Sequence, residues 1–238
     1  MIFNKLLSSP ESVTEKVFDS VLRNQSLLLT YFNQHCFNVY FEDEIYRNLI
    51  DRKFNAYQAD LGVYLAAKFL NHSNPKRIGS TTVNEIILKG LISKDIPVAI
   101  IGGNFERSFI LREAKNSGIN LVYYKSGFFA EPEVDNIIDQ LNRLDVQVIF
   151  VGMGVPKQEL FAEKLSISLH NKIIICVGIF FEYYFTTTKR APVYIQKIGF
   201  EWMYRLLSEP KRLWRRYLIG IPEFIFRVIK IKFGLTKR

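Results

Sequence analysis

Carboxylates are the residues of this sequence from which a catalytic acid or base must come, and Asp60 is the main candidate. It follows a strand-like run, Phe54–Tyr57, and precedes Gly62 and a helical stretch. A general base has to lie within hydrogen-bonding reach of the proton that it removes. The structural alternative is an N-cap, because an aspartate before a helix commonly accepts hydrogen bonds from the first turn. Neither cysteine lies in a motif that would make it a nucleophile.

Two glycine-containing loops are candidates for binding a phosphate. Gly102 and Gly103 separate a predicted strand from a predicted helix. The second loop reads GMGVPKQE and contains Gly152, Gly154, Lys157, Gln158 and Glu159. Glycines let the backbone approach a phosphate, and a helix N-terminus behind them presents free N–H groups. The loop lacks the third glycine of a dinucleotide fingerprint and does not match the GxxxxGK[ST] pattern of a P-loop. The structural alternative is a capped helix start whose charged side chains are solvated.

The elements that would position these residues alternate between strand and helix. The segments at 98–101, 146–151 and 173–177, which are apolar apart from Gln147, are typical of strands covered by helices on both faces. Strands are also expected at 26–32 and 120–124, with helices at 10–23, 42–51, 63–70, 80–92, 106–117, 131–144 and 156–165. The pattern predicts an α/β fold, a Rossmann-like mostly parallel sheet with helices on both faces.

The positive charge is concentrated at one end of the chain. The net charge is +9, yet residues 189–238 hold 13 Lys/Arg and 3 Asp/Glu, a balance of +10. We therefore predict an α/β core over 1–188 and a short basic, amphipathic helical appendage over 189–238. Three short helices are expected there, at 199–207, 210–219 and 222–233, punctuated by Pro210, Gly220 and Pro222. Such a block suggests a polyanionic partner, either an anionic membrane surface, which we favour, or nucleic acid.

Other features bear on the compartment. The N-terminal segment has acidic residues and no long apolar run, so a secretory signal is not expected. The longest apolar run, 173–181, is far short of the roughly 20 residues that span a bilayer. Two cysteines suggest reduced thiols in a cytoplasmic protein, and three scattered histidines make a zinc site improbable.

Three ordered motifs resemble the WecG/TagA/CpsF glycosyltransferase family. The run VGMGVPKQE at 151–159 resembles the family's V-x-x-G-x-P-K-Q-E signature, and Arg190-Ala191-Pro192 resembles its RAP element. The run GFEWMYRLLSEPKR at 199–212 resembles its GLEWLYRLLxEPxR element. With Gly127-Phe128-Phe129 and the Gly102-Gly103 loop, the resemblance covers roughly residues 26–226.

The resemblance implies a Rossmann-like transferase with a membrane-directed C-terminal appendage. Such enzymes move a sugar from a UDP-sugar to an undecaprenyl-diphosphate-linked saccharide, for teichoic acid, enterobacterial common antigen, capsule or exopolysaccharide. The expected enzyme is inverting, independent of metals and cofactors, and peripheral on the inner face of the plasma membrane.

Residues carry over from the family one by one. Asn33 matches the asparagine of the family's Thr-x-Asn, whose threonine position is Tyr31 here. The family's proposed catalytic base is the aspartate of DGxG. An ungapped match puts Ala59 there, whereas a one-residue deletion restores Asp60, which is the alignment we favour. Arg77 matches the family's arginine, and Gln158 its pocket glutamine.

These matches imply a division of roles. Asp60 would deprotonate the acceptor hydroxyl. The expected substrate-binding residues are Asn33, Arg77, Gly102, Gly103, Gly154, Lys157, Gln158, Glu159 and Arg190. Arg77 and the helix start at 154–158 would stabilise the departing UDP diphosphate. The residues expected to engage the lipid diphosphate or complete the pocket are Arg205, Arg212, Arg215 and Arg216.

Two other functions remain open on the sequence. The departures at Ala59 and Tyr31 are consistent with a catalytically degenerate, membrane-associated scaffold of a polysaccharide-assembly complex. A less favoured reading is an RNA-binding α/β protein that uses its basic end on phosphates. The donated sugar, the lipid-linked acceptor and assembly into a homo-oligomer are left open.

Overall fold

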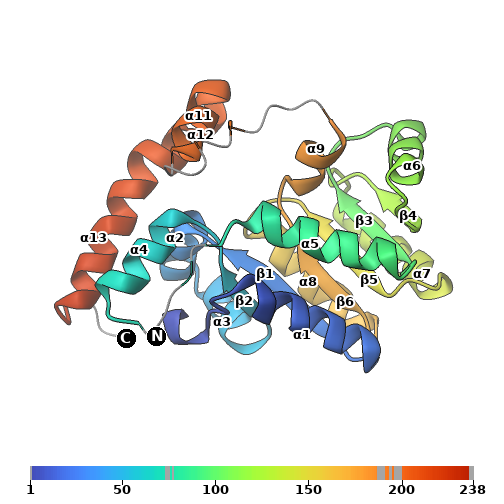
Figure 1. Ribbon diagram of the computed structural model, residues 1–238, viewed down its shortest axis with the longest axis horizontal. Helices are drawn as coiled ribbons and strands as arrows, with labels where there is room; N and C mark the ends of the chain where they lie inside the picture. The colour runs from blue at the N-terminus through green and yellow to red at the C-terminus, as the bar shows by residue number, and fades with distance from the viewer. Residues whose placement is uncertain are drawn as a thin grey trace.

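The computed structural model describes residues 2–72, 76, 78–186, 191–192, 195 and 200–235. One six-stranded sheet with all pairings parallel forms the centre of the molecule, in the order β2-β1-β6-β5-β3-β4 (Figure 1). The strands are β1 Leu27–Phe32, β2 Asn55–Gln58, β3 Val98–Gly102, β4 Leu121–Lys125, β5 Val148–Gly152 and β6 Ile173–Cys176. The α/β fold with a Rossmann-like parallel sheet is therefore confirmed.

Helices cover both faces of the sheet because its central strands are apolar on both sides. One face packs against α1 Pro10–Leu22, α5 Ser80–Ser93, α6 Arg107–Asn116 and α9 Phe180–Phe185. The other face packs against α7 Val134–Arg143, which follows the short 3-10 turn η2 Glu131–Glu133, and α8 Lys157–Ser168. Strand β5 shows the reason: its first four residues are all buried.

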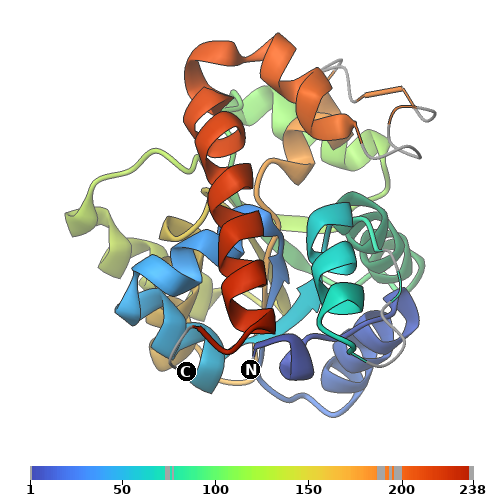
Figure 2. The same cartoon turned by 90° about the vertical axis from the view of Figure 1, so that its left-hand side faces the viewer.

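A third apolar cluster lies beyond the β1–β2 end of the sheet. It joins the 3-10 turn η1 Ile2–Lys5 to α2 Gln34–Glu42, α3 Glu44–Arg52, α4 Leu61–Phe69 and α13 Gly220–Lys232. The ring of Phe224 on α13 meets that of Phe37 on α2 edge-on, 4.9 Å between centroids. Figure 2 shows α13 and α4 side by side at this end. Residues far apart in sequence thus border the same edge of the sheet.

Two predictions about the elements need correction. The helices α2 and α9 were not expected, because Gln34–Glu42 and Phe180–Phe185 lack a clear apolar period. The predicted breaks at Gly220 and Pro222 are wrong. Helix α12 Pro210–Trp214 runs through a π-helical turn, η3 Arg215–Ile219, directly into α13. Pro222 has no N–H to continue the helical hydrogen bonds, and the π-helical turn lies directly before it, so the helix passes this proline with locally altered geometry.

The C-terminal segment begins its described part with α11 Glu201–Ser208, which lies above α12 at the top of Figure 1. Among the described residues no helix is long and apolar enough to cross a bilayer.

Candidate active site

Two cavities meet at the carboxyl edge of the sheet. The first, of about 670 Å³, lies between α4, α11 and α13, and we call it the apolar cavity. The second, of about 590 Å³, lies beside the loops after β1 and β6, and we call it the arginine cavity. Ligands of open α/β proteins bind beyond the carboxyl ends of the strands, so both cavities are where a substrate is expected.

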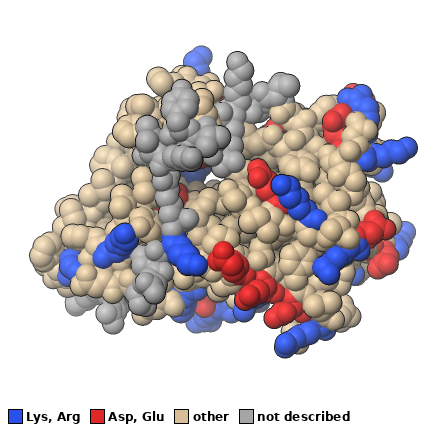
Figure 3. Space-filling model, in the orientation of Figure 1, with Lys and Arg blue, Asp and Glu red and all other residues tan. Residues whose placement is uncertain are grey.

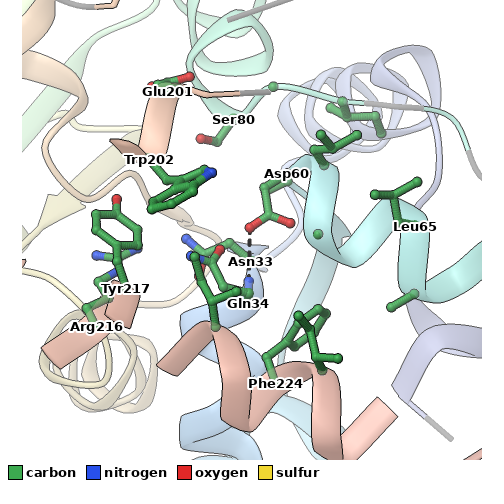
Figure 4. A pocket seen from close by; sticks show the side chains of 18 of the residues that line it. Asn33, Gln34, Asp60, Leu65, Ser80, Glu201, Trp202, Arg216, Tyr217 and Phe224 are labelled. Carbon is green, nitrogen blue, oxygen red and sulfur yellow. Dashed lines mark hydrogen bonds between the residues drawn. The ribbon is translucent and has the colours of Figure 1, made fainter. Parts of the chain in front are cut away.

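Asp60 borders the apolar cavity at the start of α4. Its Oδ1 accepts a hydrogen bond from the backbone N–H of Val63 at 2.7 Å, and its Oδ2 accepts one from the N–H of Gln34 at 3.0 Å. The carboxylate therefore caps α4, as the structural alternative predicted, and also faces Asn33 and Trp202 across the cavity (Figure 4). Burial raises the pKa of Asp60, while the two backbone donors and the charge of Arg216 oppose that rise. A raised pKa suits a carboxylate that has to accept a proton near neutral pH.

The neighbouring Ala59 is buried and carries no group that could take a proton. Its methyl group contributes to the wall of the same cavity. Of the two residues that compete for the family's aspartate position, only Asp60 brings a carboxylate to the cavity.

Four arginines line the arginine cavity, and they differ in how their charges are neutralised. Arg205 donates to the Tyr183 hydroxyl at 2.7 and 2.9 Å and forms an ion pair with Glu201, with 3.7 Å between Nε and Oε1. Arg212 forms a two-pronged ion pair with Glu209. Arg215 and Arg216 have no ion pair with a described acidic residue. The buried Nε of Arg216 has no hydrogen-bond partner among the described residues. An anion entering this cavity would find cationic groups still available.

The two cavities share a wall. Both are lined by Asn33, Ser80, Thr81, Arg205 and Arg216. Asn33 caps α2 by accepting from the N–H groups of His35 and Cys36, each at 3.0 Å. Burial and the charge of Arg216 lower the pKa of His35 to about 4, so its imidazole is neutral at pH 7. The shared wall places a cation and neutral polar groups between an apolar and a cationic compartment.

Of the predicted glycines, one lines a cavity. Gly154 has φ +80° and borders the arginine cavity, and a Cβ there would have open space around it. Gly102 and Gly103 line neither cavity. A Cβ on Gly102 would lie 2.5 Å from the carbonyl oxygen of Gly152, its partner in the sheet. Gly102 therefore allows β3 and β5 to come together at their ends.

The PKQE residues lie beneath the arginine cavity rather than on its surface. Gln158 and Glu159 are both completely buried. The Gln158 amide donates to Glu159 Oε1 at 2.8 Å and accepts from the N–H of Gly178 at 3.0 Å. Thr30 donates to the same Glu159 oxygen at 2.7 Å. These bonds connect the start of α8 to β1 and to Gly178 in the wall of the arginine cavity.

Lys157 also lies outside both cavities. Its Nζ is 3.4 Å from the carbonyl oxygen of Gly127 and lies over the ring of Phe129. Arg77 and Arg190, two further predicted substrate-binding residues, lie outside the described residues. No group of three His, Cys, Asp or Glu side chains that could hold a metal occurs in the described part of the chain.

Several cavity residues, among them Trp202, His35 and Tyr183, were not identified from the sequence as site residues. Trp202 lines the apolar cavity, and His35 and Tyr183 line the arginine cavity. Trp202 lies within the 199–212 motif, which offered a signal. His35 and Tyr183 follow the ends of β1 and β6, and only the strand order shows that these ends are neighbours.

A parallel α/β sheet with a carboxylate and four arginines gathered at its carboxyl edge defines a ligand-binding protein of the Rossmann-like class. The model of the glycosyl transferase WecG/TagA/CpsF family matches residues 4–238, essentially the whole chain. The protein belongs to this family of glycosyltransferases.

Proposed function

We propose that this protein transfers a sugar from a UDP-sugar to an undecaprenyl-diphosphate-linked saccharide, with inversion and without a metal ion, in cell-surface polysaccharide synthesis. The observation that carries the proposal is the position of Asp60 in the apolar cavity, beside the wall shared with the arginine cavity. A carboxylate and unpaired cations this close suit a displacement in which one group is deprotonated and a diphosphate leaves.

In the proposed reaction the acceptor hydroxyl attacks the anomeric carbon of the donor. Asp60 takes the hydroxyl proton, the new glycosidic bond forms, and the bond from the anomeric carbon to the UDP oxygen breaks. UDP leaves with the electron pair of that bond. Arg205 and Arg216 line both cavities, so their guanidinium groups would lie between the donor and acceptor diphosphates and would stabilise the charge that develops on the departing UDP.

The remaining predicted residues take indirect or peripheral roles in this proposal. Gly154 would let the backbone approach the donor. Gln158 and Glu159, being buried, would act by holding Gly178 in the cavity wall. Arg212 and Arg215 would contact either diphosphate at the rim.

We also propose that residues 189–238 direct the protein to the inner face of the plasma membrane. The described helices of this segment expose large apolar side chains among their basic ones, including Leu207, Trp214, Leu218 and Phe233. An amphipathic, basic surface of this composition binds anionic interfaces.

The test is release of UDP from a panel of UDP-sugars with a short-chain polyprenyl-diphosphate saccharide, with and without EDTA. We expect release that survives EDTA and falls by at least about 100-fold in Asp60→Asn. Asparagine caps a helix as well as aspartate does, so this variant should keep α4 intact. Unchanged turnover in Asp60→Asn would show that the base lies elsewhere.

A catalytically degenerate, membrane-associated scaffold is the second candidate. It is favoured by one observation: both oxygens of Asp60 already accept backbone hydrogen bonds, as they would in a purely structural cap. This candidate predicts binding to anionic vesicles with no release of UDP from any donor.

A further inference from the structure

The apolar cavity continues as a groove between α4 and α13 whose walls are exposed and hydrophobic. Leu65 and Phe69 on α4 are 53% and 46% exposed, and Ile225 and Ile229 on α13 are 50% and 41% exposed. Single exposed apolar residues are ordinary, but a contiguous set facing one hollow marks a binding surface. In Figure 3 the part of the surface at the left, over α4 and α13, is mostly tan with Lys and Arg side chains set among the uncharged ones.

The groove changes in polarity along its length. Its inner end holds Asp60 and Arg216, and its floor is formed by the buried side chains of Phe224 and Val228. Figure 4 shows Leu65 on α4 and Phe224 on α13, the two helices that border the groove. Towards the outer end, Lys232 Nζ lies over the ring of Phe69, 5.4 Å from its centroid.

The groove is long enough for a chain rather than a compact group. Ile221 and Ile229 both line it and are eight residues apart on a helix, which corresponds to about 12 Å at 1.5 Å per residue. An apolar and elongated site favours a linear hydrocarbon.

We propose that this groove binds the first isoprene units of the lipid-linked acceptor, with the attached diphosphate at Arg216. The proposal rests on the proposed function and adds the place where the lipid lies. The occupant is inferred from charge complementarity. The Arg216 guanidinium at the inner end would pair with an anion, and the exposed apolar side chains of α4 and α13 would contact an aliphatic chain. An apolar helix of a partner protein would leave the Arg216 charge without a counter-charge.

The groove also gives a reason for the position of Asp60. A chain lying between α4 and α13 brings its diphosphate end to the wall shared with the arginine cavity. The saccharide beyond the diphosphate would then lie between Asp60 and Trp202. The groove would thus fix the position of the acceptor hydroxyl relative to the Asp60 carboxylate.

The test compares binding of geranylgeranyl diphosphate and inorganic pyrophosphate to the whole chain by titration calorimetry in detergent-free buffer. The groove variant is Leu65→Gln/Ile229→Gln. The matched control is Phe226→Gln, an aromatic residue of α13 that is 57% exposed and lies outside the cavity. We expect the wild type to bind the prenyl diphosphate more tightly than pyrophosphate by at least about tenfold. The double variant should lose most of that ratio, and the control should keep it.

Three results would overturn the proposal: equal affinities for the two probes, a ratio that survives in the double variant, or an equal loss in Phe226→Gln. The last result would assign the effect to general adsorption on α13. The binding measurement does not require turnover, so a chain that binds the prenyl diphosphate in the groove but releases no UDP would retain this inference while the transferase proposal fails. Circular dichroism of each variant checks that the fold is kept.

Discussion

Arg216 and Arg212 line the same cavity but differ in their partners, and this difference should separate them in donor binding. Arg212 is held by Glu209, whereas Arg216 has no ion pair among the described residues and a buried Nε without a partner. A hydrogen bond to a charged group contributes about 1.5–3 kcal/mol. We expect Arg216→Gln to weaken UDP binding by roughly 10- to 100-fold and Arg212→Gln to weaken it less. Calorimetric titration with UDP measures both, and a larger effect at Arg212 would contradict this account.

Glu159 should make the stability of the protein depend on pH. Burial raises the pKa of Glu159 from 4.5 to about 7, so in this range the folded state binds a proton that the unfolded state releases. The free energy of unfolding therefore falls as the pH rises from about 4.5 to about 7 and is independent of this group above that. The total loss should be on the order of 3 kcal/mol.

Glu159→Gln keeps the shape and cannot ionise, so it should remove this dependence. Urea unfolding of both proteins at pH 5, 6, 7 and 8 measures the difference between them, which cancels the contributions of other groups. Parallel stability curves would show that the Glu159 carboxyl is not held protonated.

At the scale of the elements, the sequence predicted the sheet better than it predicted the helices around the site. Five of the six strands have apolar or β-branched runs, and all six were expected within a few residues of their observed places; β2, Asn55–Gln58, is the exception in composition. The helix α2 was missed because its apolar residues lie on more than one side and give no clear period, since they pack against η1, β1, α3 and α13. The continuous α12–η3–α13 segment was missed because Gly220 and Pro222 are usually signals for a break.

The sequence also predicted one part of the candidate site better than another. The sequence singled out Asp60, Asn33, Gly154 and the arginines, all of which border the cavities where described. It could not show that Gln158 and Glu159 are buried, because their position depends on how β1 and β6 pair. From the sequence alone, polar residues that follow a glycine-containing loop, such as Gln158 and Glu159, could either contact a ligand or bond to one another inside the protein.

Helix α13 should depend on one aromatic contact. Phe224 is buried against Phe37, whereas Phe226, two residues later, is exposed. We expect Phe224→Ala to destabilise the protein by about 3–5 kcal/mol and to increase hydrogen exchange of α13 amides before that of the sheet. Phe226→Ala is the control and should change stability by no more than about 0.5 kcal/mol. Equal effects of the two variants would mean that α13 is not docked through Phe224.

At the scale of the whole molecule, the net positive charge is carried by the C-terminal segment. Residues 189–238 carry a balance of +10 while the rest of the chain is close to neutral. Binding to vesicles that contain anionic lipid should therefore be strong at low ionic strength and decrease steeply as salt rises, since the Debye length shortens from about 10 Å at 0.1 M to about 3 Å at 1 M. Vesicle sedimentation measures this. Binding that is equally strong on neutral vesicles would assign the interaction to apolar residues alone.

The wall shared by the two cavities has a thermodynamic consequence. Arg205 and Arg216 belong to both compartments, and both come from the same C-terminal helical segment. A ligand that immobilises the Arg205 and Arg216 side chains from one cavity reduces the conformational entropy that is lost when a second ligand binds in the other cavity. Linkage then requires reciprocity: whatever factor UDP contributes to the affinity for a prenyl diphosphate, the prenyl diphosphate must contribute to the affinity for UDP. The affinities for the two substrates would thus be coupled through the residues of the shared wall.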